Sequence, residues 1–280
     1  MDELQTPPQS AESSAGGRTP TASIGMPVFN GAKYIREALD ALLNQTFTDF
    51  ELIISDNAST DATGAICEEY AHRDRRIRYV RQPRNLGPIA NFQYVLSKAQ
   101  GRYFMWAACD DRWASTFLER TAAILEGDPG CGLAFCNVIE RNLESGEEKL
   151  HRITPSNHES AIYNYITRTA HMCPSLIYGL FRVEGMKNME FTSFDFAEVH
   201  FVADVALRMR IRVLDEYLYV AGTKGVREPY SLTHDKTNRT VFLHKQYELL
   251  KKHYPFPVAQ CLFLLVCLAM VRHKAKYWRY

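Results

Sequence analysis

Apolar residues occur in short runs through the first half of the chain, and amphipathic segments separate these runs. Each run has the length of a buried strand, and the runs cover residues 22–29, 50–55, 77–80 and 103–108. The amphipathic segments repeat apolar residues at helical spacing, over residues 33–44, 61–71, 88–99 and 115–125. Strands that alternate with helices in this way predict an α/β fold, with a mostly parallel sheet and helices on both faces.

The second half has a less regular pattern. It predicts a strand at residues 132–140, a charged turn at 141–149, and helices at 163–168, 201–209 and 241–253.

Three segments follow from these patterns. Residues 1–21 are polar and rich in Ser, Pro, Gly and Thr, which predicts a disordered leader. Residues 22–250 predict one Rossmann-like domain, whose halves are residues 22–125 and the more irregular residues 126–250. Residues 251–280 predict an apolar helix with basic flanks.

Residues 258–271 of the last segment are apolar apart from Gln260. A helix of this length spans roughly 21 Å, which is short of the ~30 Å hydrocarbon core of a bilayer. The basic residues on its two sides are Lys251, Lys252 and His253, and then Arg272, His273, Lys274, Lys276 and Arg279. This pattern favours peripheral contact of residues 258–280 with an anionic membrane surface. A helix packed in the core or in a dimer interface is the alternative.

Composition narrows the function classes. The 280 residues include 33 Lys and Arg and 32 Asp and Glu, so the net charge of +1 does not indicate a nucleic-acid-binding surface. The 7 Cys are odd in number and form no C-x-x-C pair, which argues against a zinc site and a disulfide framework. Free buried thiols are typical of a reducing cytosol. We therefore expect a cytoplasmic protein, placed at the inner face of the cell membrane if its last helix binds lipid.

Polar or ring-bearing residues follow the four strands predicted in the first half. They are Phe29-Asn30, Asp56-Asn57, Arg84-Asn85 and Asp110-Asp111. In open α/β sheets, ligands bind beyond the carboxyl ends of the strands. The sequence therefore predicts one ligand site along this edge of the sheet.

Asp110 and Asp111 are the candidates for metal chemistry. Adjacent residues of an extended segment point in opposite directions, so we assign Asp111 to the metal and Asp110 to the nucleotide-ribose side of the site. Mg²⁺ and Mn²⁺ prefer oxygen ligands and keep several waters, so one or two carboxylates suffice. Such a cation stabilises a leaving diphosphate, while another carboxylate accepts the proton of an attacking hydroxyl. A helix cap or a solvated turn is the alternative for the pair.

Residues 23–125 resemble the family-2 glycosyltransferases, which have the GT-A fold. Four motifs carry the resemblance, at residues 24–30, 52–61, 84–87 and 109–111 (IGMPVFN, LIISDNASTD, RNLG and CDD). A looser likeness continues at residues 178–182, 203–204 and 215–218. The resemblance implies metal-dependent, inverting transfer of a sugar from a nucleotide-diphosphate sugar to a hydroxyl of a saccharide or lipid-linked acceptor. It also implies a place in surface polysaccharide or glycolipid synthesis.

The resemblance assigns roles to single residues. Asp56 matches the family aspartate that accepts a hydrogen bond from the nucleobase, and Phe29 stands beside the base, where a Tyr is frequent. The other nucleotide-sugar-binding positions that it implies are Pro27, Asn30, Arg84 and Asp110. The sequence departs from the usual motifs at Asn57-Ala58, where Asp-Gly is frequent, and at Cys109, where another Asp or a small polar residue is common.

The catalytic base is expected in the second half of the chain. Similar enzymes often carry Glu-Asp before a helix, and here Ala203-Asp204 opens a predicted helix. Asp204 is therefore our candidate for the base. Asp195 and Glu198 are the competing carboxylates.

Two other function classes fit the sequence less well. A catalytically silent nucleotide-sugar-binding protein of the same fold would have no need for Asp56, the Asp110-Asp111 pair and Asp204 together. A nucleotidyltransferase would show a loop rich in Gly and basic residues near the first strand, where this sequence has PVFN at residues 27–30. A glycosyltransferase is thus the prediction.

Overall fold

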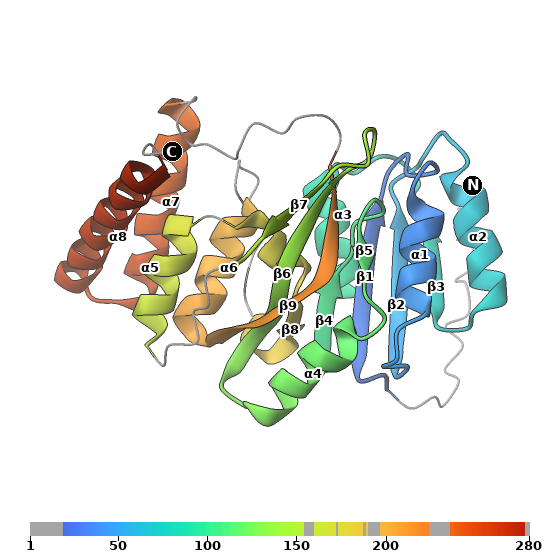
Figure 1. The fold of residues 1–280 in the computed structure, drawn as a ribbon, viewed down its shortest axis with the longest axis horizontal. Coiled ribbons are helices and arrows are strands. Elements are labelled where there is room, and N and C mark those ends of the chain that lie inside the picture. The colour runs from blue at the N-terminus through green and yellow to red at the C-terminus, as the bar shows by residue number, and fades with distance from the viewer. Residues whose placement is uncertain are drawn as a thin grey trace, which may run out of the picture.

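A mixed sheet of nine strands forms the centre of the protein (Figure 1). The computed structural model describes residues 19–153, 160–171, 173–186, 189, 197–223 and 236–277, so most of the predicted leader lies outside the described residues. Within those residues the strand order is β3-β2-β1-β4-β8-β6-β9-β5, and β7 pairs with β6. Helices flank the sheet, and the predicted α/β class is confirmed.

The first half of the chain forms the parallel part of the sheet. Its strands are β1 (Ala22–Val28), β2 (Phe50–Asp56), β3 (Ile77–Arg81) and β4 (Tyr103–Trp106). The pairs β1–β2, β2–β3 and β1–β4 are all parallel. Every residue of β2 and β4 is buried, which is why these strands have nearly continuous apolar sequences.

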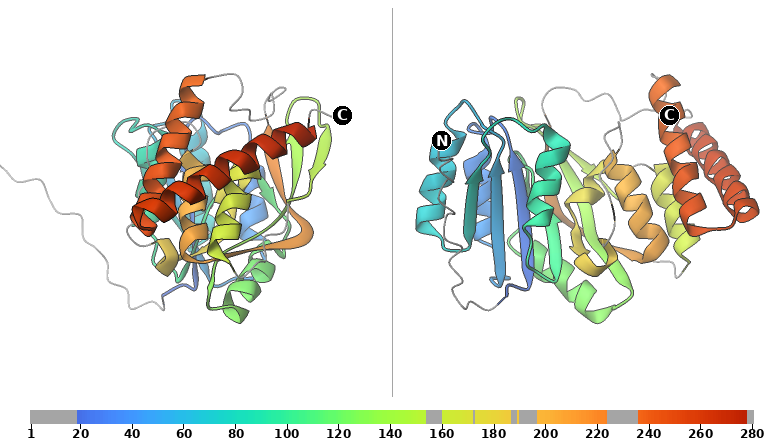
Figure 2. Two further views of the ribbon diagram at one scale, coloured as in Figure 1. Left: turned by 90° about the vertical axis from the view of Figure 1, so that its left-hand side faces the viewer. Right: turned by 180° about the vertical axis from the view of Figure 1, so that it is seen from behind.

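Helices connect these parallel strands. They are α1 (Ile35–Leu43), α2 (Thr63–Arg73), α3 (Pro88–Ser97) and, after β4, α4 (Phe117–Gly127). Figures 1 and 2 show that α1 and α3 cover opposite faces of the sheet. The four predicted helices of the first half are thus present, with ends that differ by a few residues.

The second half completes the sheet with strands in both directions. They are β5 (Arg112–Trp113), β6 (Cys131–Asn142), β7 (Glu148–His151), β8 (Leu180–Arg182) and β9 (Arg210–Thr223). The pair β6–β9 is parallel, whereas β4–β8, β6–β8, β5–β9 and β6–β7 are antiparallel. The sheet is therefore mostly parallel only in the first half. The predicted turn at 141–149 includes the end of β6 and the start of β7, and the pattern did not predict β9.

Trp106, at the end of β4, joins the two halves of the core. Its ring is fully buried and meets Phe104, Phe181 and Phe201 edge to face, at centroid distances of 4.6, 5.7 and 5.4 Å. These rings come from β4, β8 and a helix of the second half, α6 (Ala197–Arg208). Aromatic pairs in this geometry add to the stabilisation from burial, so the parallel half and the second half share one hydrophobic core.

Four helices lie beyond β9 at the end of the molecule opposite β3 (Figures 1 and 2). They are α5 (Ala161–His171), α6 (Ala197–Arg208), α7 (Lys236–His253) and α8 (Phe256–Tyr277). Helix α5 packs on both α6 and α8, and α7 packs on α8. Among the described residues, no helix is long and apolar enough to cross a membrane.

Candidate functional site

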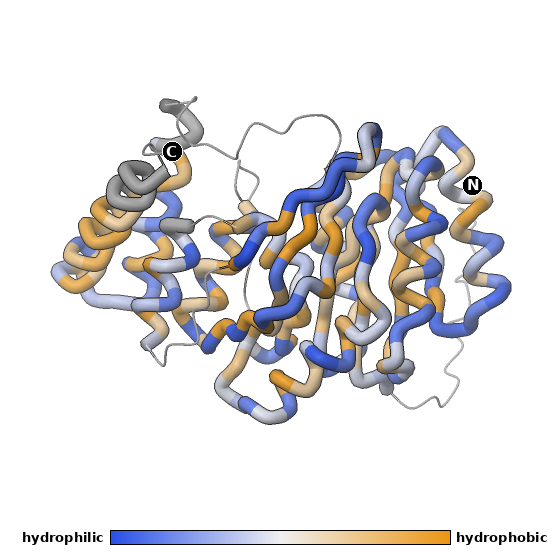
Figure 3. The backbone as a smooth tube through the Cα atoms, viewed as in Figure 1, coloured by the Kyte–Doolittle hydropathy of each residue, from blue (hydrophilic) through white to orange (hydrophobic). Residues whose placement is uncertain are grey.

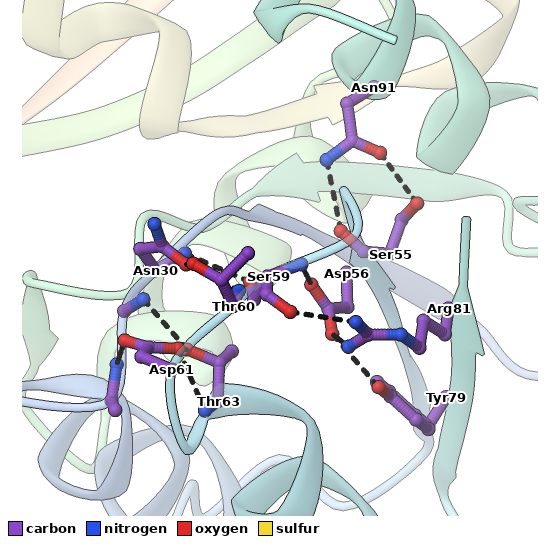
Figure 4. A network of polar contacts seen from close by, with 12 residues as sticks. Asn30, Ser55, Asp56, Ser59, Thr60, Asp61, Thr63, Tyr79, Arg81 and Asn91 are labelled. Atoms are coloured by element: carbon purple, nitrogen blue, oxygen red, sulfur yellow. Dashed lines mark hydrogen bonds and ion pairs between the residues drawn. The ribbon is translucent and has the colours of Figure 1, made fainter. Parts of the chain in front are cut away.

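The carboxylate of Asp56 organises the loop after β2 (Figure 4). Its Oδ1 accepts the N–H of Ser59 at 2.8 Å, and its Oδ2 accepts the Tyr79 hydroxyl at 3.0 Å and the Arg81 guanidinium at 2.9 Å. Burial and the hydrogen bond to Asp56 raise the pKa of Tyr79 to about 12, so this hydroxyl remains a donor at neutral pH. The Asp56 side chain is fully buried, and its hydrogen bonds hold the loop in place. Direct contact of Asp56 with a nucleobase stays a prediction.

Asn30 ties the loop after β1 to the same segment (Figure 4). Its N–H donates to Ser59 Oγ at 2.9 Å, and its Oδ1 accepts the N–H of Thr60 at 2.8 Å. The φ angle of Asn30 is 51°, in the left-handed region that Asn adopts more readily than most residues. The amide oxygen of this predicted ligand residue is thus engaged inside the protein.

Asn57 explains one departure from the family motif. Its Nδ2 donates to Asn85 Oδ1 at 2.9 Å and to the Gly87 carbonyl at 3.2 Å, and its Oδ1 accepts the Leu86 N–H at 2.7 Å. An ionised Asp has no donor, so at this position it would face two oxygen acceptors. The amide therefore holds the turn at residues 84–87 against the end of β2.

The four strand exits meet at one edge of the sheet, as the sequence predicts. The loops after β1 and β2 are joined through Asn30, and the turn after β3 is joined to β2 through Asn57. The exit of β4 reaches the loop after β1, because a Cβ at Gly31 would lie only 2.8 Å from the Cys109 sulfur. The small residues Cys109 and Gly31 thus allow the segment after β4 to lie close to the loop after β1.

Two of the predicted nucleotide-binding side chains are exposed beside these loops. Phe29 is 47% exposed at the end of β1, and Arg84 is exposed in the turn after β3. Pro27 is half-buried near the end of β1. These side chains line no part of the cavity beside Asp110 and Asp111, so the predicted residues form two neighbouring groups.

Asp111 is held in place by β9. The Tyr219 hydroxyl donates to its Oδ2, and the Gly222 N–H donates to its Oδ1 at 2.9 Å. Burial and the adjacent Asp111 carboxylate raise the pKa of Tyr219 well above its ordinary value, so the phenol stays protonated. A Cβ at Gly222 would lie 2.2 Å from the carbonyl oxygen of Asp110, so glycine is needed for β9 to approach this closely.

A cavity of about 260 Å³ lies beside the Asp110-Asp111 pair. Both of these residues line it, and so does Glu198, which belongs to the first turn of α6. Its apolar walls come from α3 and from a 3₁₀ helix, η1 (Pro174–Tyr178), through side chains such as Phe92 and Ile177. The structure therefore brings together carboxylates from two distant segments in one partly apolar cavity.

Asp204 lies away from this cavity. Its Oδ1 accepts Arg208 Nε at 2.8 Å and lies 3.0 Å from His253 Nε2, so it links α6 to α7. The prediction that Asp204 opens a helix is wrong, because α6 begins at Ala197. The geometry favours Glu198 over Asp204 as the group that meets a ligand, and Asp195 lies outside the described residues.

The residues at the cavity suit a hard divalent cation. Asp110 and Asp111 supply carboxylate oxygens, and metal-binding carboxylates are commonly oriented by hydrogen bonds such as those from Tyr219 and Gly222. In the part of the chain that the structure describes, no three His, Cys, Asp or Glu residues are grouped to hold a metal ion. A cation that keeps several waters and gains phosphate oxygens from a ligand does not require three such side chains.

Comparison with known proteins now gives the family. Residues 23–187 match the model of Glycosyl transferase family 2, which is more than half of the chain. The chain belongs to this family.

Curated relatives match part of the chain. A putative teichuronic acid biosynthesis glycosyltransferase of Bacillus subtilis, TuaG, is 32% identical over 116 residues, which cover 41% of this chain and 46% of that protein. The glycosyltransferase GlyA of Streptococcus pneumoniae is 34% identical over 94 residues, which cover 34% of this chain and 13% of that protein. The matches span less than half the length of either relative.

Solved structures are similar over nearly the whole chain. TarS 1–349 of S. aureus, in complex with UDP, has a TM-score of 0.66 at 17% identity, and the match covers 93% of this chain and 72% of that one. The mannosyltransferase PcManGT of Pyrobaculum calidifontis, in complex with GDP-Man and Mn²⁺, has a TM-score of 0.57 at 16% identity, covering 92% and 74%. At these identities the likeness bears on the fold, which is the expected GT-A fold.

Sequence reasoning missed two residues of the site, Tyr219 and Gly222. The looser family likeness was followed only to residue 218, one position before Tyr219. The signal available was the run of aromatic and aliphatic residues at 217–220 (YLYV), which is typical of a strand. Nothing local in that pattern indicates which carboxylate the strand would meet.

The close contact at Gly222 yields a prediction. Gly222→Ala should place a methyl group against the Asp110 carbonyl, displace the Asp110-Asp111 segment and lower the free energy of unfolding by about 1–3 kcal/mol. Gly127→Ala is the matched control, because its added Cβ meets no atom within 4 Å. Urea unfolding of both variants measures the effect, and equal stability of the two would contradict the close approach of β9.

Proposed function

We propose that this chain transfers a sugar from a nucleoside-diphosphate sugar to an acceptor hydroxyl. The transfer inverts the anomeric carbon and uses a divalent cation, Mn²⁺ or Mg²⁺. The observation that carries the proposal is the cavity that Asp110, Asp111 and Glu198 line together. Family membership supports it, and so do the nucleotides in the solved structures of similar fold, which hold UDP, UDP-GlcNAc or GDP-Man.

The nucleotide side of the proposed site is the edge where the strand exits meet. Phe29 offers an exposed ring on which a base can stack, and Arg84 offers an exposed cation for the base or the phosphates. Asp56 and Asn30 hold the loops on which these groups depend. Asp110 lies between this edge and the cavity, in the position that we assign to the ribose.

Asp111 is the proposed metal ligand. The hydrogen bonds from Tyr219 and Gly222 fix its carboxylate toward one wall of the cavity, so little reorganisation is needed when a ligand arrives. When bound there, the cation stabilises the negative charge that gathers on the departing diphosphate.

Glu198 is the proposed general base. It lines the same cavity as the aspartate pair but comes from α6, so an acceptor between them would have a carboxylate on the side away from the diphosphate. The acceptor oxygen forms its bond to the anomeric carbon while the bond from that carbon to the diphosphate breaks. The hydroxyl proton passes to the Glu198 carboxylate, and the single displacement inverts the configuration.

The acceptor is proposed as a saccharide or a lipid-linked saccharide in surface polysaccharide or glycolipid synthesis. The relative named for teichuronic acid biosynthesis supports this class. We place the reaction at the cytoplasmic face of a membrane, where such acceptors are carried. A catalytically silent protein of the same fold remains the competing function, and it would bind the donor without consuming it.

Turnover tests the proposed function directly. A thermal-shift screen with UDP, GDP, CDP and dTDP identifies the nucleotide, because a ligand raises the apparent stability. Release of that diphosphate from its sugar nucleotides, with oligosaccharide and lipid fractions as acceptors, should then require Mn²⁺ or Mg²⁺. Asp111→Asn should lower the rate at least a hundredfold, while Asp40→Asn, a carboxylate paired with Tyr70, should not. Full activity of Asp111→Asn, or of the wild type with excess chelator, would remove the metal assignment.

The base assignment gives a second prediction. Glu198→Gln should lower the single-turnover rate by about 10²–10⁴-fold and leave donor affinity nearly unchanged, because proton transfer matters in the transition state. Asp204→Asn serves as the control, since Asp204 contacts Arg208 and His253 and lies outside the cavity. If Asp204→Asn is the inactive variant and Glu198→Gln is active, the assignment returns to Asp204.

A further inference from the structure

Helix α8 has one side packed on the protein and one side exposed. Ala259, Leu262 and Val266 are buried, which places one face of the helix in the core against α5 and α7. Five other large apolar residues of the helix are among the most exposed of the described chain. They are Phe256 at 63%, Val258 at 42%, Leu264 at 59%, Leu265 at 48% and Leu268 at 55%.

The exposed residues form a continuous stripe. Cys261, Leu264, Leu265 and Leu268 are spaced three, four and seven residues apart, so they lie on one face of the helix. Figure 3 shows hydrophobic colour along α8, at the end of the molecule farthest from α2. Contiguous apolar surface of this kind marks a site of interaction.

The charge of the segment that carries this stripe is one-sided. Residues 249–280 contain six Lys and Arg and no Asp or Glu, whereas the rest of the chain has five more acidic than basic residues. Lys251 and Lys252 are exposed at the corner between α7 and α8, and Lys251 pairs with Glu248 at 2.7 Å. The sequence adds Arg272, Lys274, Lys276 and Arg279 on the other side of the apolar stretch.

We infer that the exposed face of α8 docks on an anionic lipid surface, with the helix axis in the plane of the membrane. Its apolar side chains would enter the boundary between headgroups and acyl chains, and the basic residues at both ends would meet anionic headgroups. The described helix is not a membrane span, which agrees with a helix lying on the surface. The inference stands apart from the reaction proposed for the cavity.

Lipid is favoured over a second copy of the chain for an electrostatic reason. A symmetric dimer through this face would place the same basic ends of two helices near each other. The Glu248–Lys251 pair offsets one charge of each copy, and residues 249–280 contain no acidic residue to neutralise the other basic residues. An anionic bilayer supplies the missing negative charge together with an apolar interior.

Docking through α8 would also set the orientation of the cavity. Asp204 of α6 contacts His253 at the end of α7, and α7 packs on α8. Glu198 belongs to the first turn of the same α6. The membrane-facing helix is thus held to the helix that lines the cavity, and a lipid-linked acceptor would approach from a defined side.

Vesicle co-sedimentation of the full chain tests the inference. The wild type should bind vesicles of phosphatidylcholine with about one third phosphatidylglycerol, and binding should fall in high salt and on pure phosphatidylcholine. The triple variant L264Q, L265Q and L268Q should lose at least tenfold in vesicle affinity. The control variant L150Q and Y217Q changes exposed apolar residues on β7 and β9, and it should bind like the wild type.

Each other outcome overturns the docking surface. Absence of wild-type binding, or equal binding by the wild type and the triple variant, would show that α8 does not contact lipid. If sedimentation velocity shows that the triple variant turns a dimer into a monomer while the wild type ignores vesicles, the face is a dimer interface. Donor hydrolysis in detergent-free solution should be the same for the wild type and the triple variant, so failure of docking is distinguishable from failure of the proposed reaction.

Discussion

The two hydrogen bonds that β9 gives to Asp111 are the constraint on which the candidate site depends. Tyr219 follows Asp111 by 108 residues and comes from the mixed half of the sheet, whereas Asp111 follows the last strand of the parallel half. A buried carboxylate that loses a donor costs about 1–3 kcal/mol or more, and at Gly222 the backbone of β9 is so close to Asp110 that a Cβ would not fit. The Asp111 carboxylate, the proposed metal ligand, is therefore in place only when both halves of the sheet have assembled.

Buried polar groups on the proposed nucleotide side of the site also hold backbone segments in place through hydrogen bonds. Asp56 and Asn57 use their side chains to hold the segments that follow β2 and β3, and they present little surface to a ligand. The groups left at the surface are the ring of Phe29 and the guanidinium of Arg84. The buried polar groups thus hold the loops of the proposed nucleotide site, and the exposed side chains remain available to a ligand.

The parallel half of the fold and the common edge of its strand exits were predictable, because continuous apolar runs mark strands buried on both faces. Strand β9 was not predictable, because it contains charged residues such as Arg210. Arg210 pairs with Asp128, which lies far away in the sequence. The start of α6 was missed for another reason. Residues 197–207 are buried on nearly all sides, which removes the amphipathic period of a surface helix. The prediction of Asp204 as the base places that residue at the start of a helix, whereas α6 begins at Ala197 and its first turn brings Glu198 to the cavity.

The most direct measurement is the affinity of the wild-type chain for a nucleoside diphosphate, by calorimetry, with Mn²⁺ and with a chelator. If Asp111 and a bound diphosphate share one cation, the cation must raise the affinity for the diphosphate. The diphosphate must then raise the affinity for the cation by the same factor. The account predicts binding at least tenfold tighter with Mn²⁺ for one of UDP, GDP, CDP and dTDP. Equal affinity in the two conditions, or no binding of any of the four, would contradict the account.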